Sequence, residues 1–473
     1  MALADSDVRR PPSNLGQVFI PALLLLLFLS PMAYGAVASS SFTFSPIQNL
    51  SNNSGASTAP VIATVNYQGH QYVYVAWEDT SSGSRRTYFR VSQNGGSTWG
   101  STTVFSGLSG KANALTSAVQ MAANGNYVFL TWMQGAATAF AASSNNGASF
   151  SCGASHAKAC ILSSGVPVGT MTAQAVAASG KHVYVSWSDS ADNGSQYIFL
   201  AASNNAGGSF SNPVKLNTVQ AYTHGEDEIA AVGQYVYATW DSIYFTVSSN
   251  YGQTWSAPIQ LRPNSCTYPC AGREPMISAV GSDVYVTFPM GGLGGTSTYS
   301  TIVNVSHDHG LTWTQTDLSK GIISNTREVQ VTSNGRNVYV TSRGNQTGGT
   351  QQYAYVSNDE GVTWSAPILL GPLKSGTENG FGGFALDSTT GAVYLQWPHG
   401  TLSQLYLSES IDNGTSWSFP QQVSSSTGGV VAMGDPKGGQ GPMAAAAHGQ
   451  VYLVWEDKTT GSGDIYFTSA PSL

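Results

Sequence analysis

Eight short segments with alternating apolar and aromatic residues recur along the chain. The first, Val73 to Trp77, reads VYVAW, and the later copies read VFLTW, VYVSW, VYATW, VYVTF, VYVTS, VYLQW and VYLVW. The seven intervals between Tyr74 in the first copy and Tyr452 in the last average 54 residues. Runs of β-branched and aromatic residues bounded by Gly and Asn turns are typical of strands. The pattern therefore predicts eight structural repeats, each with one buried strand.

A polar turn pattern follows seven of these segments. Its consensus is S-x-(D/N)-x-G-x-(S/T)-(W/F), and it spans residues 92–99, 143–150, 203–210, 248–255, 306–313, 357–364 and 410–417. The acceptor side chain at its third position is Asn94, Asn145, Asn205, Asn250, Asp308, Asp359 or Asp412. An Asp or Asn oxygen here accepts backbone N–H bonds, and the Gly adopts positive φ. We therefore predict that these residues are structural and carry no catalysis.

This turn is the Asp-box, or bacterial neuraminidase repeat, and from about Phe42 to Leu473 the chain resembles sialidase-type Asp-box propellers. The resemblance implies an all-β fold, a single β-propeller of four-stranded blades. Eight blades of about 54 residues account for residues 39–473, which we predict to be one domain. The alternative is a seven-bladed ring with one repeat outside it.

The two ends of the propeller region predict how the ring closes. The last repeat ends with the strand Asp464 to Ser469, and no Asp-box follows it. The segment Phe42 to Leu50 resembles the residues after the fourth box, Trp255 to Leu261. We therefore expect the N-terminal segment to supply the outer strand of the last blade, which also hides a sheet edge.

Composition and the N-terminus restrict the class of protein. Charged residues make up 9% of the chain and the formal net charge is −7, so no basic surface is available for nucleic acid. Arg9 and Arg10 precede the apolar run 18–29, and small residues follow it. Residues 1–38 are therefore predicted to be a secretory signal peptide, and the protein a secreted or cell-surface monomer. An uncleaved signal anchor is the alternative, and only that would attach the protein to a membrane.

Four cysteines form two local pairs. In an exported protein they predict the disulfides Cys152–Cys160 and Cys266–Cys270, each closing a short loop on the ligand-binding face. The spacings C-x7-C and C-x3-C do not suit zinc, so we predict no metal site and no cofactor. A structural calcium ion at Asp189 to Gly194 is the alternative, although that segment lacks the terminal Glu of a calcium loop.

Strand alternation separates two faces of the ring. The Asp-box turns share one face, here called the Asp-box face, with the turns between the first and second strands of each repeat. The opposite face, the central loop face, carries the loops after the VYxxW strands and the loops that join repeats. The charged residues of these loops that we predict to bind ligand are Arg273, Glu274, Arg327, Glu328, Arg343, Glu226 and Asp227.

The resemblance gives the arginines a specific meaning. Sialidases hold the carboxylate of a terminal acidic sugar with three arginines, and they use an Asp acid/base and a Tyr activated by a Glu. The segment Arg273-Glu274-Pro275 resembles the motif of the first arginine, Arg327 stands at the equivalent point of the next repeat, and Arg343 is a candidate third member. No Tyr–Glu pair or separate acid/base Asp is evident. The Arg-Glu pairs also fit a purely structural ion-pair network.

We therefore expect a propeller that binds a glycan or an extracellular protein ligand on its central loop face without catalysing a reaction, and we assign no catalytic residues. The alternative is an enzyme, an exo-glycosidase of sialidase type that hydrolyses terminal acidic sugars.

Overall fold

The computed structural model of the protein describes residues 41–105, 116–153, 158–164, 171–190, 196–217, 227–262, 272–291, 299–319, 322–346, 349–370, 383–399, 403–431 and 443–473. Over these residues the secondary structure is entirely β, arranged as eight four-stranded antiparallel sheets. The predicted signal peptide 1–38, the pair Cys266 and Cys270, and Glu226 lie outside the described residues. Within the described part of the chain, no helix has the length and apolar character of a membrane span.

Each sheet is one blade, and its strands follow chain order from the centre of the ring outward. The innermost strands are β2 (Ser57–Tyr67), β6 (Thr116–Asn124), β10 (Met171–Ser179), β14 (Asp227–Val232), β18 (Met276–Val280), β22 (Ser324–Ser333), β26 (Gly383–Leu386) and β30 (Ala444–Ala447). The second strands are β3 (His70–Asp79), β7 (Tyr127–Gln134), β11 (His182–Ser190), β15 (Tyr235–Trp240), β19 (Asp283–Gly291), β23 (Val338–Gln346), β27 (Val393–His399) and β31 (Gln450–Asp457). The third strands are β4 (Arg86–Ser92), β8 (Thr138–Ser143), β12 (Gln196–Ser203), β16 (Tyr244–Ser248), β20 (Tyr299–Ser306), β24 (Gly349–Ser357), β28 (Gln404–Ser410) and β32 (Asp464–Pro471). The outer strands are β5 (Thr103–Phe105), β9 (Cys160–Ile161), β13 (Val214–Lys215), β17 (Ile259–Gln260), β21 (Thr314–Asp317), β25 (Ile368–Leu369), β29 (Gln421–Gln422) and β1 (Gln48–Asn49).

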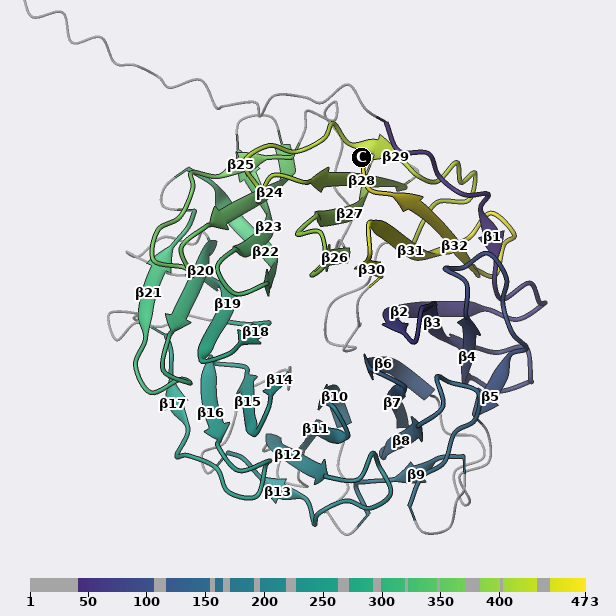
Figure 1. Ribbon diagram of the computed structural model, residues 1–473, viewed down its shortest axis with the longest axis horizontal. Coiled ribbons are helices and arrows are strands. Elements are labelled where there is room, and N and C mark those ends of the chain that lie inside the picture. The colour runs from purple at the N-terminus through teal and green to yellow at the C-terminus, as the bar shows by residue number, and fades with distance from the viewer. Residues whose placement is uncertain are drawn as a thin grey trace, which may run out of the picture. The chain divides into compact units, whose positions relative to one another are not determined.

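The eight blades form a closed ring, as Figure 1 shows. Every innermost strand contacts the innermost strands of the blades on both sides, and β30 of the eighth blade contacts β2 of the first. The prediction of an eight-bladed propeller is therefore confirmed. Each VYxxW segment lies in the second strand of its blade, which places the repeating aromatic residues at the most buried position of the sheet.

The N-terminal segment closes the ring as predicted. Strand β1 pairs antiparallel with β32, so the last blade is built from both ends of the chain. The backbone N–H of Leu50 donates to the carbonyl of Ile465 at 2.7 Å, and that of Ser45 donates to the carbonyl of Ser469 at 2.8 Å. Phe42, which is buried, packs into the apolar core between the seventh and eighth blades.

Ser472 and Leu473 occupy the interblade position that an Asp-box fills elsewhere in the ring. The carboxylate of Glu409, buried on the third strand of blade seven, accepts hydrogen bonds from the Ser472 hydroxyl and from the backbone N–H of Leu473, the latter at 2.9 Å. In the other blades this interblade position meets an Asp-box. These two residues therefore connect blade eight to the third strand of blade seven.

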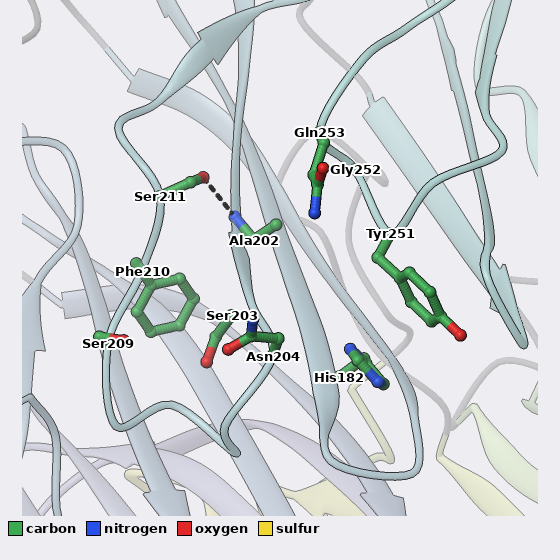
Figure 2. Close-up of a pocket in the computed structure, with 10 residues that line it drawn as sticks. All are labelled: His182, Ala202, Ser203, Asn204, Ser209, Phe210, Ser211, Tyr251, Gly252 and Gln253. Carbon is green, nitrogen blue, oxygen red and sulfur yellow. Dashed lines mark hydrogen bonds between the residues drawn. The ribbon is translucent and has the colours of Figure 1, made fainter.

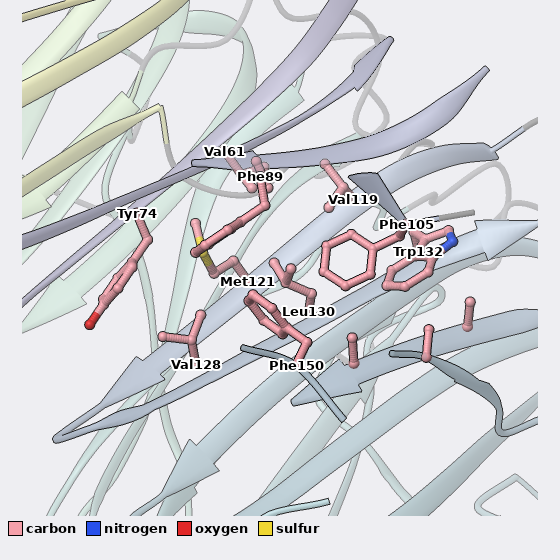
Figure 3. Close-up of a cluster of buried hydrophobic side chains, with 14 of the residues drawn as sticks. Val61, Tyr74, Phe89, Phe105, Val119, Met121, Val128, Leu130, Trp132 and Phe150 are labelled. Carbon is pink, nitrogen blue, oxygen red and sulfur yellow. The ribbon is translucent and has the colours of Figure 1, made fainter. Parts of the chain in front are cut away.

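The apolar core is divided into clusters between neighbouring blades. Figure 3 shows the cluster between blades one and two, where Val61, Tyr74 and Phe89 of the first blade face Leu130 and Trp132 of the second. All five side chains are buried. Because these clusters combine side chains from neighbouring blades, apolar burial holds the blades to one another.

The Asp-box turns are held by their own side chains. In the fifth box, Asp308 Oδ1 accepts hydrogen bonds from the Ser306 hydroxyl at 2.8 Å and from the Thr312 backbone N–H at 2.8 Å, while the Gly310 N–H donates to Ser306 Oγ at 2.8 Å. The hydrogen bonds from Thr312 hold the pKa of Asp308 down at about 2. The Asn boxes repeat this arrangement, for example at Asn94. These residues act in the turns themselves.

Each Asp-box Gly also leaves room for a side chain of the preceding blade. Gly96, with φ of +83°, lies so close to the Phe467 ring of the eighth blade that an added Cβ would stand 2.3 Å from it. Gly310 meets Phe245 of the fourth blade in the same way, at 2.4 Å. The Asp-boxes therefore connect neighbouring blades as well as ordering their own hairpins.

The Cys152–Cys160 disulfide is present, but its predicted place on the ligand-binding face is wrong. Ser151 bridges to Ala142, and Cys160 pairs with Phe140, so both cysteines lie along the outer edge of the third strand of blade two. Cys152 is buried in the cluster shared with blade three. The disulfide closes an insertion at the outer rim, because the loop follows the Asp-box rather than the second strand.

Candidate functional site

The fifth and sixth blades begin with the same irregular turn on the central loop face. Glu274 and Glu328 have positive φ values of +51° and +55°, and each follows an arginine. Ala59 has the same conformation, +51°, at the equivalent point of blade one. The turn is therefore part of the repeat, and it sets Arg273 and Arg327 at equivalent positions, as the sequence predicts.

Arg343 and Glu328 form an ion pair at the centre of this region. Arg343 lies on β23 directly across from Arg327 on β22. Its Nη2 atom is 2.6 Å from Glu328 Oε1, and the two side chains are only 20% and 8% exposed. A pair this sheltered from water is held firmly in one geometry, because breaking it would leave a desolvated charge.

Arg327 faces solvent beside this pair. Its guanidinium carbon lies 5.2 Å from the centroid of the Tyr299 ring, at the start of β20 in blade five. Cation–π contact within about 6 Å attracts a guanidinium to a ring face. The contact orients an exposed arginine, and it adds an aromatic surface that sequence inspection did not single out.

Burial and the neighbouring charges together set the pKa of Glu328 above its ordinary value. Burial raises the pKa of Glu328 to about 7, the negative charge of Glu274 adds to the rise, and Arg343 and Arg327 oppose it. These couplings show that four of the predicted residues lie in one electrostatic cluster, Glu274, Arg327, Glu328 and Arg343, here called the arginine cluster.

A second acidic group adjoins the arginine cluster in blade four. Asp241 Oδ1 accepts a 3.3 Å hydrogen bond from the backbone N–H of Glu274. Asp227, at the start of β14, is buried, and its pKa is raised to about 7 by desolvation and by the charge of Asp241. The pKa of its neighbour Glu228 is raised to about 8 by burial and by Asp227. The predicted residue Asp227 thus lies inside the blade junction, in contrast to the exposed Arg327.

Changing Asp227 to Asn should make stability less dependent on pH. The folded protein holds this proton to about pH 7, whereas an unfolded Asp releases it near about pH 4. Stability from this group is therefore present below about pH 4 and is lost as the pH rises through about 7. We expect Asp227→Asn to exceed the wild type in unfolding free energy above about pH 7 and to lose this advantage near about pH 4, in urea titrations across the range. A constant difference at every pH would show that Asp227 is not protonated in the fold.

Two predicted residues are not assigned to this arrangement, one by its position and one because it is not described. Arg273 is exposed before β18, and among the described residues none of the hydrogen bonds or ion pairs joins it to the arginine cluster. Glu226 lies outside the described residues. The sequence-based prediction did not include Tyr299 and Asp241, which contact Arg327 and Glu274 of the arginine cluster. Tyr299 begins a third strand, and Asp241 directly follows the VYATW strand, so position in the repeat was the available signal.

Two hollows lie on the other side of the blades, between neighbouring Asp-boxes. One, of about 300 Å³, lies between blades three and four, and Figure 2 shows His182, Asn204 and Phe210 among its lining residues. The His182 ring stacks on Tyr251 at 4.4 Å. The other, of about 470 Å³, lies between blades six and seven beside Trp364. Neither hollow is lined by a predicted ligand-binding residue. The arginine cluster is therefore the stronger candidate for a functional site.

One known protein family matches the central part of the chain. Residues 182–394 match the family described as BNR repeat-like domain. No curated protein matched the sequence. Among solved structures, the chain is similar to Trypanosoma rangeli sialidase in complex with sialic acid, at 13% identity and a TM-score of 0.37 over 92% of this chain. The match spans 59% of that sialidase chain.

Two further structures match at similarly low identity. One is an ulvan lyase of a polysaccharide lyase family, at 11% identity and a TM-score of 0.45, over 80% of this chain and 96% of the lyase. The other is a protein of unknown function from Dyadobacter fermentans, at 10% identity and a TM-score of 0.41, over 90% of this chain and 99% of that one. The chain is therefore an eight-bladed β-propeller with seven Asp-box turns, and its residues 182–394 match the BNR repeat-like domain family.

Proposed function

We propose that this protein is a secreted or cell-surface propeller that binds acidic groups of a glycan or of an extracellular protein on its central loop face, without catalysing a reaction. The observation that carries the proposal is the exposed guanidinium of Arg327, held over the Tyr299 ring beside the ordered pair of Arg343 and Glu328. A planar guanidinium binds carboxylate or sulfate oxygens in a bidentate manner.

The two arginines of the arginine cluster have different roles. Arg343 is already neutralised by Glu328 at 2.6 Å, so it serves mainly to shape the site. Arg327 has no such close carboxylate among the ion pairs of the described residues. Its charge is therefore available to a ligand, and the Tyr299 ring beside it offers a surface on which a sugar ring can stack.

Two features support the proposed location outside the cell, namely the N-terminal sequence and one disulfide bond. The apolar run 18–29 predicts export, and the Cys152–Cys160 disulfide is compatible with an oxidising compartment. The low charge content of 9% and the many Ser and Thr residues also suit an extracellular surface.

An exo-glycosidase of sialidase type is the second candidate, and one observation favours it. A carboxyl group with a pKa of about 7, as at Glu328, is suited to general acid or base chemistry at neutral pH. Its close pairing with Arg343 favours the ionised form, which argues for a structural carboxylate. Binding therefore remains the first proposal.

A glycan panel tests the proposal. The purified propeller should bind sialylated, uronate-containing or sulfated oligosaccharides in preference to neutral ones, and the affinity should fall as salt shortens the Debye length to about 8 Å and below. Equal binding of neutral glycans, or no binding of any acidic ligand, would contradict it. The same glycans, presented as chromogenic glycosides, test the second candidate. Turnover that disappears in Glu328→Gln would establish an enzyme instead.

A further inference from the structure

Three side chains that commonly bind metals meet on the Asp-box face, away from the arginine cluster. They are Asp283 at the start of β19, His307 in the fifth Asp-box and Glu360 in the sixth. Their donor atoms all lie within 4.8 Å of one another, and His307 Nδ1 is 2.9 Å from Asp283 Oδ1. The first two belong to blade five and the third to blade six, so the cluster spans a blade junction.

The backbone under each donor is fixed by hydrogen bonds of the fold. In the fifth box, the N–H of His309 donates to the carbonyl of Ser282 at 2.9 Å, which holds the box against the turn that carries Asp283. In the sixth box, the carbonyl of Glu360 accepts a 3.2 Å hydrogen bond from the hydroxyl of Tyr285, a buried residue of blade five. The backbone positions of the three residues are therefore fixed, and rotation of their side chains is enough to bring the donor atoms to one metal ion.

The charges of the cluster are unbalanced. Asp283 and Glu360 bring two carboxylates together, and no Lys or Arg of the described residues forms an ion pair with either of them. His307, whose side chain is 47% exposed, contributes an imidazole nitrogen that a cation from solvent can reach. Two carboxylates and one imidazole around one point favour a cation at that point.

We propose that Asp283, His307 and Glu360 form a site for a divalent transition-metal ion of the zinc type. The imidazole nitrogen favours such an ion over calcium or magnesium, which prefer oxygen ligands alone. Zinc with ligands at about 2.0–2.2 Å needs donor atoms roughly 3–4 Å apart, close to the separations present here. Three protein ligands leave one coordination position for water, and the bound ion links blades five and six.

Zinc titration of the chelator-treated full chain tests the site. We expect one zinc ion to bind at this position and Tm to rise with zinc concentration. His307→Ala and Glu360→Gln should each weaken binding by at least about tenfold and abolish the zinc-dependent rise in Tm. Calcium at the same concentrations should produce neither effect.

A matched control separates this site from casual binding by surface histidines. His448 is also exposed, in the turn between β30 and β31 of blade eight, so His448→Asn should leave zinc binding unchanged. Glu360→Gln keeps the size of an exposed side chain, and its Tm without metal shows whether it folds. The proposal is overturned if the wild type binds no zinc, if both cluster variants bind as tightly as the wild type, or if His448→Asn loses as much affinity as they do.

Discussion

Removal of residues 42–50 is expected to lower the free energy of unfolding by several kcal/mol. The segment supplies the outer strand of the eighth blade through β1 and its flanking hydrogen bonds to β32. It also buries Phe42 and Leu50, which are 5% and 2% exposed. Burial of each side chain contributes about 1.5–3 kcal/mol, and the unpaired edge of β32 adds to the loss. Urea or thermal unfolding of the truncated chain measures the effect.

Single substitutions within the same segment provide the control. Leu50→Ser should be strongly destabilising because it places a hydroxyl in the core between blades eight and one. Ile47, which is 43% exposed, lies three residues away, and Ile47→Ser should change stability by no more than about 0.5 kcal/mol. A truncated chain with the Tm of the wild type would show that the N-terminal strand does not close the ring.

Gly96→Ala is expected to cost about 2–4 kcal/mol, which is large for the addition of one methyl group. The new Cβ would lie 2.3 Å from the ring of Phe467, and the backbone at φ of +83° would be strained as well. Phe467 is fully buried and also meets the ring of Trp99, 5.0 Å away, so it has little room to move. Chemical unfolding of the variant measures the cost.

Gly69→Ala separates the two causes. Gly69 has nearly the same φ, +80°, but an added Cβ there would meet no atom within 4 Å. Gly69→Ala should therefore show the backbone strain alone, about 1–2 kcal/mol. Equal destabilisation of the two variants would show that the Phe467 ring accommodates the added methyl group at no cost.

The propeller ring could be predicted because the sequence motifs that specify it repeat at a regular spacing. Each VYxxW segment and each Asp-box specifies local structure, and the spacing of about 54 residues fixes the number of blades. Closure followed from the similarity of Phe42 to Leu50 with an outer strand elsewhere in the chain. Each of these features depends on a short stretch of sequence, so it can be predicted without knowing how distant parts of the chain pack.

The groupings of side chains from different blades were less predictable. The equivalence of Arg273 and Arg327 could be derived from the repeat, but the stacking of Arg327 on Tyr299 depends on how blades five and six pack. The cluster of Asp283, His307 and Glu360 escaped notice for the same reason, and no metal site was expected. The disulfide was paired correctly from its spacing, whereas its side of the blade depended on which strand the loop interrupts.

The affinity of Arg327→Ala for an acidic oligosaccharide tests the central claim most directly. The matched control is Arg336→Ala, which removes an exposed arginine from the opposite end of the same blade, where its Nε donates to the Asn358 carbonyl at 2.8 Å. Calorimetric titration should show Arg327→Ala weakened by about 10–100-fold, because a charged hydrogen-bonding group contributes about 1.5–3 kcal/mol, and Arg336→Ala should bind like the wild type. Equal affinities of the wild type and Arg327→Ala, or equal losses in the two variants, would contradict a ligand site at the arginine cluster.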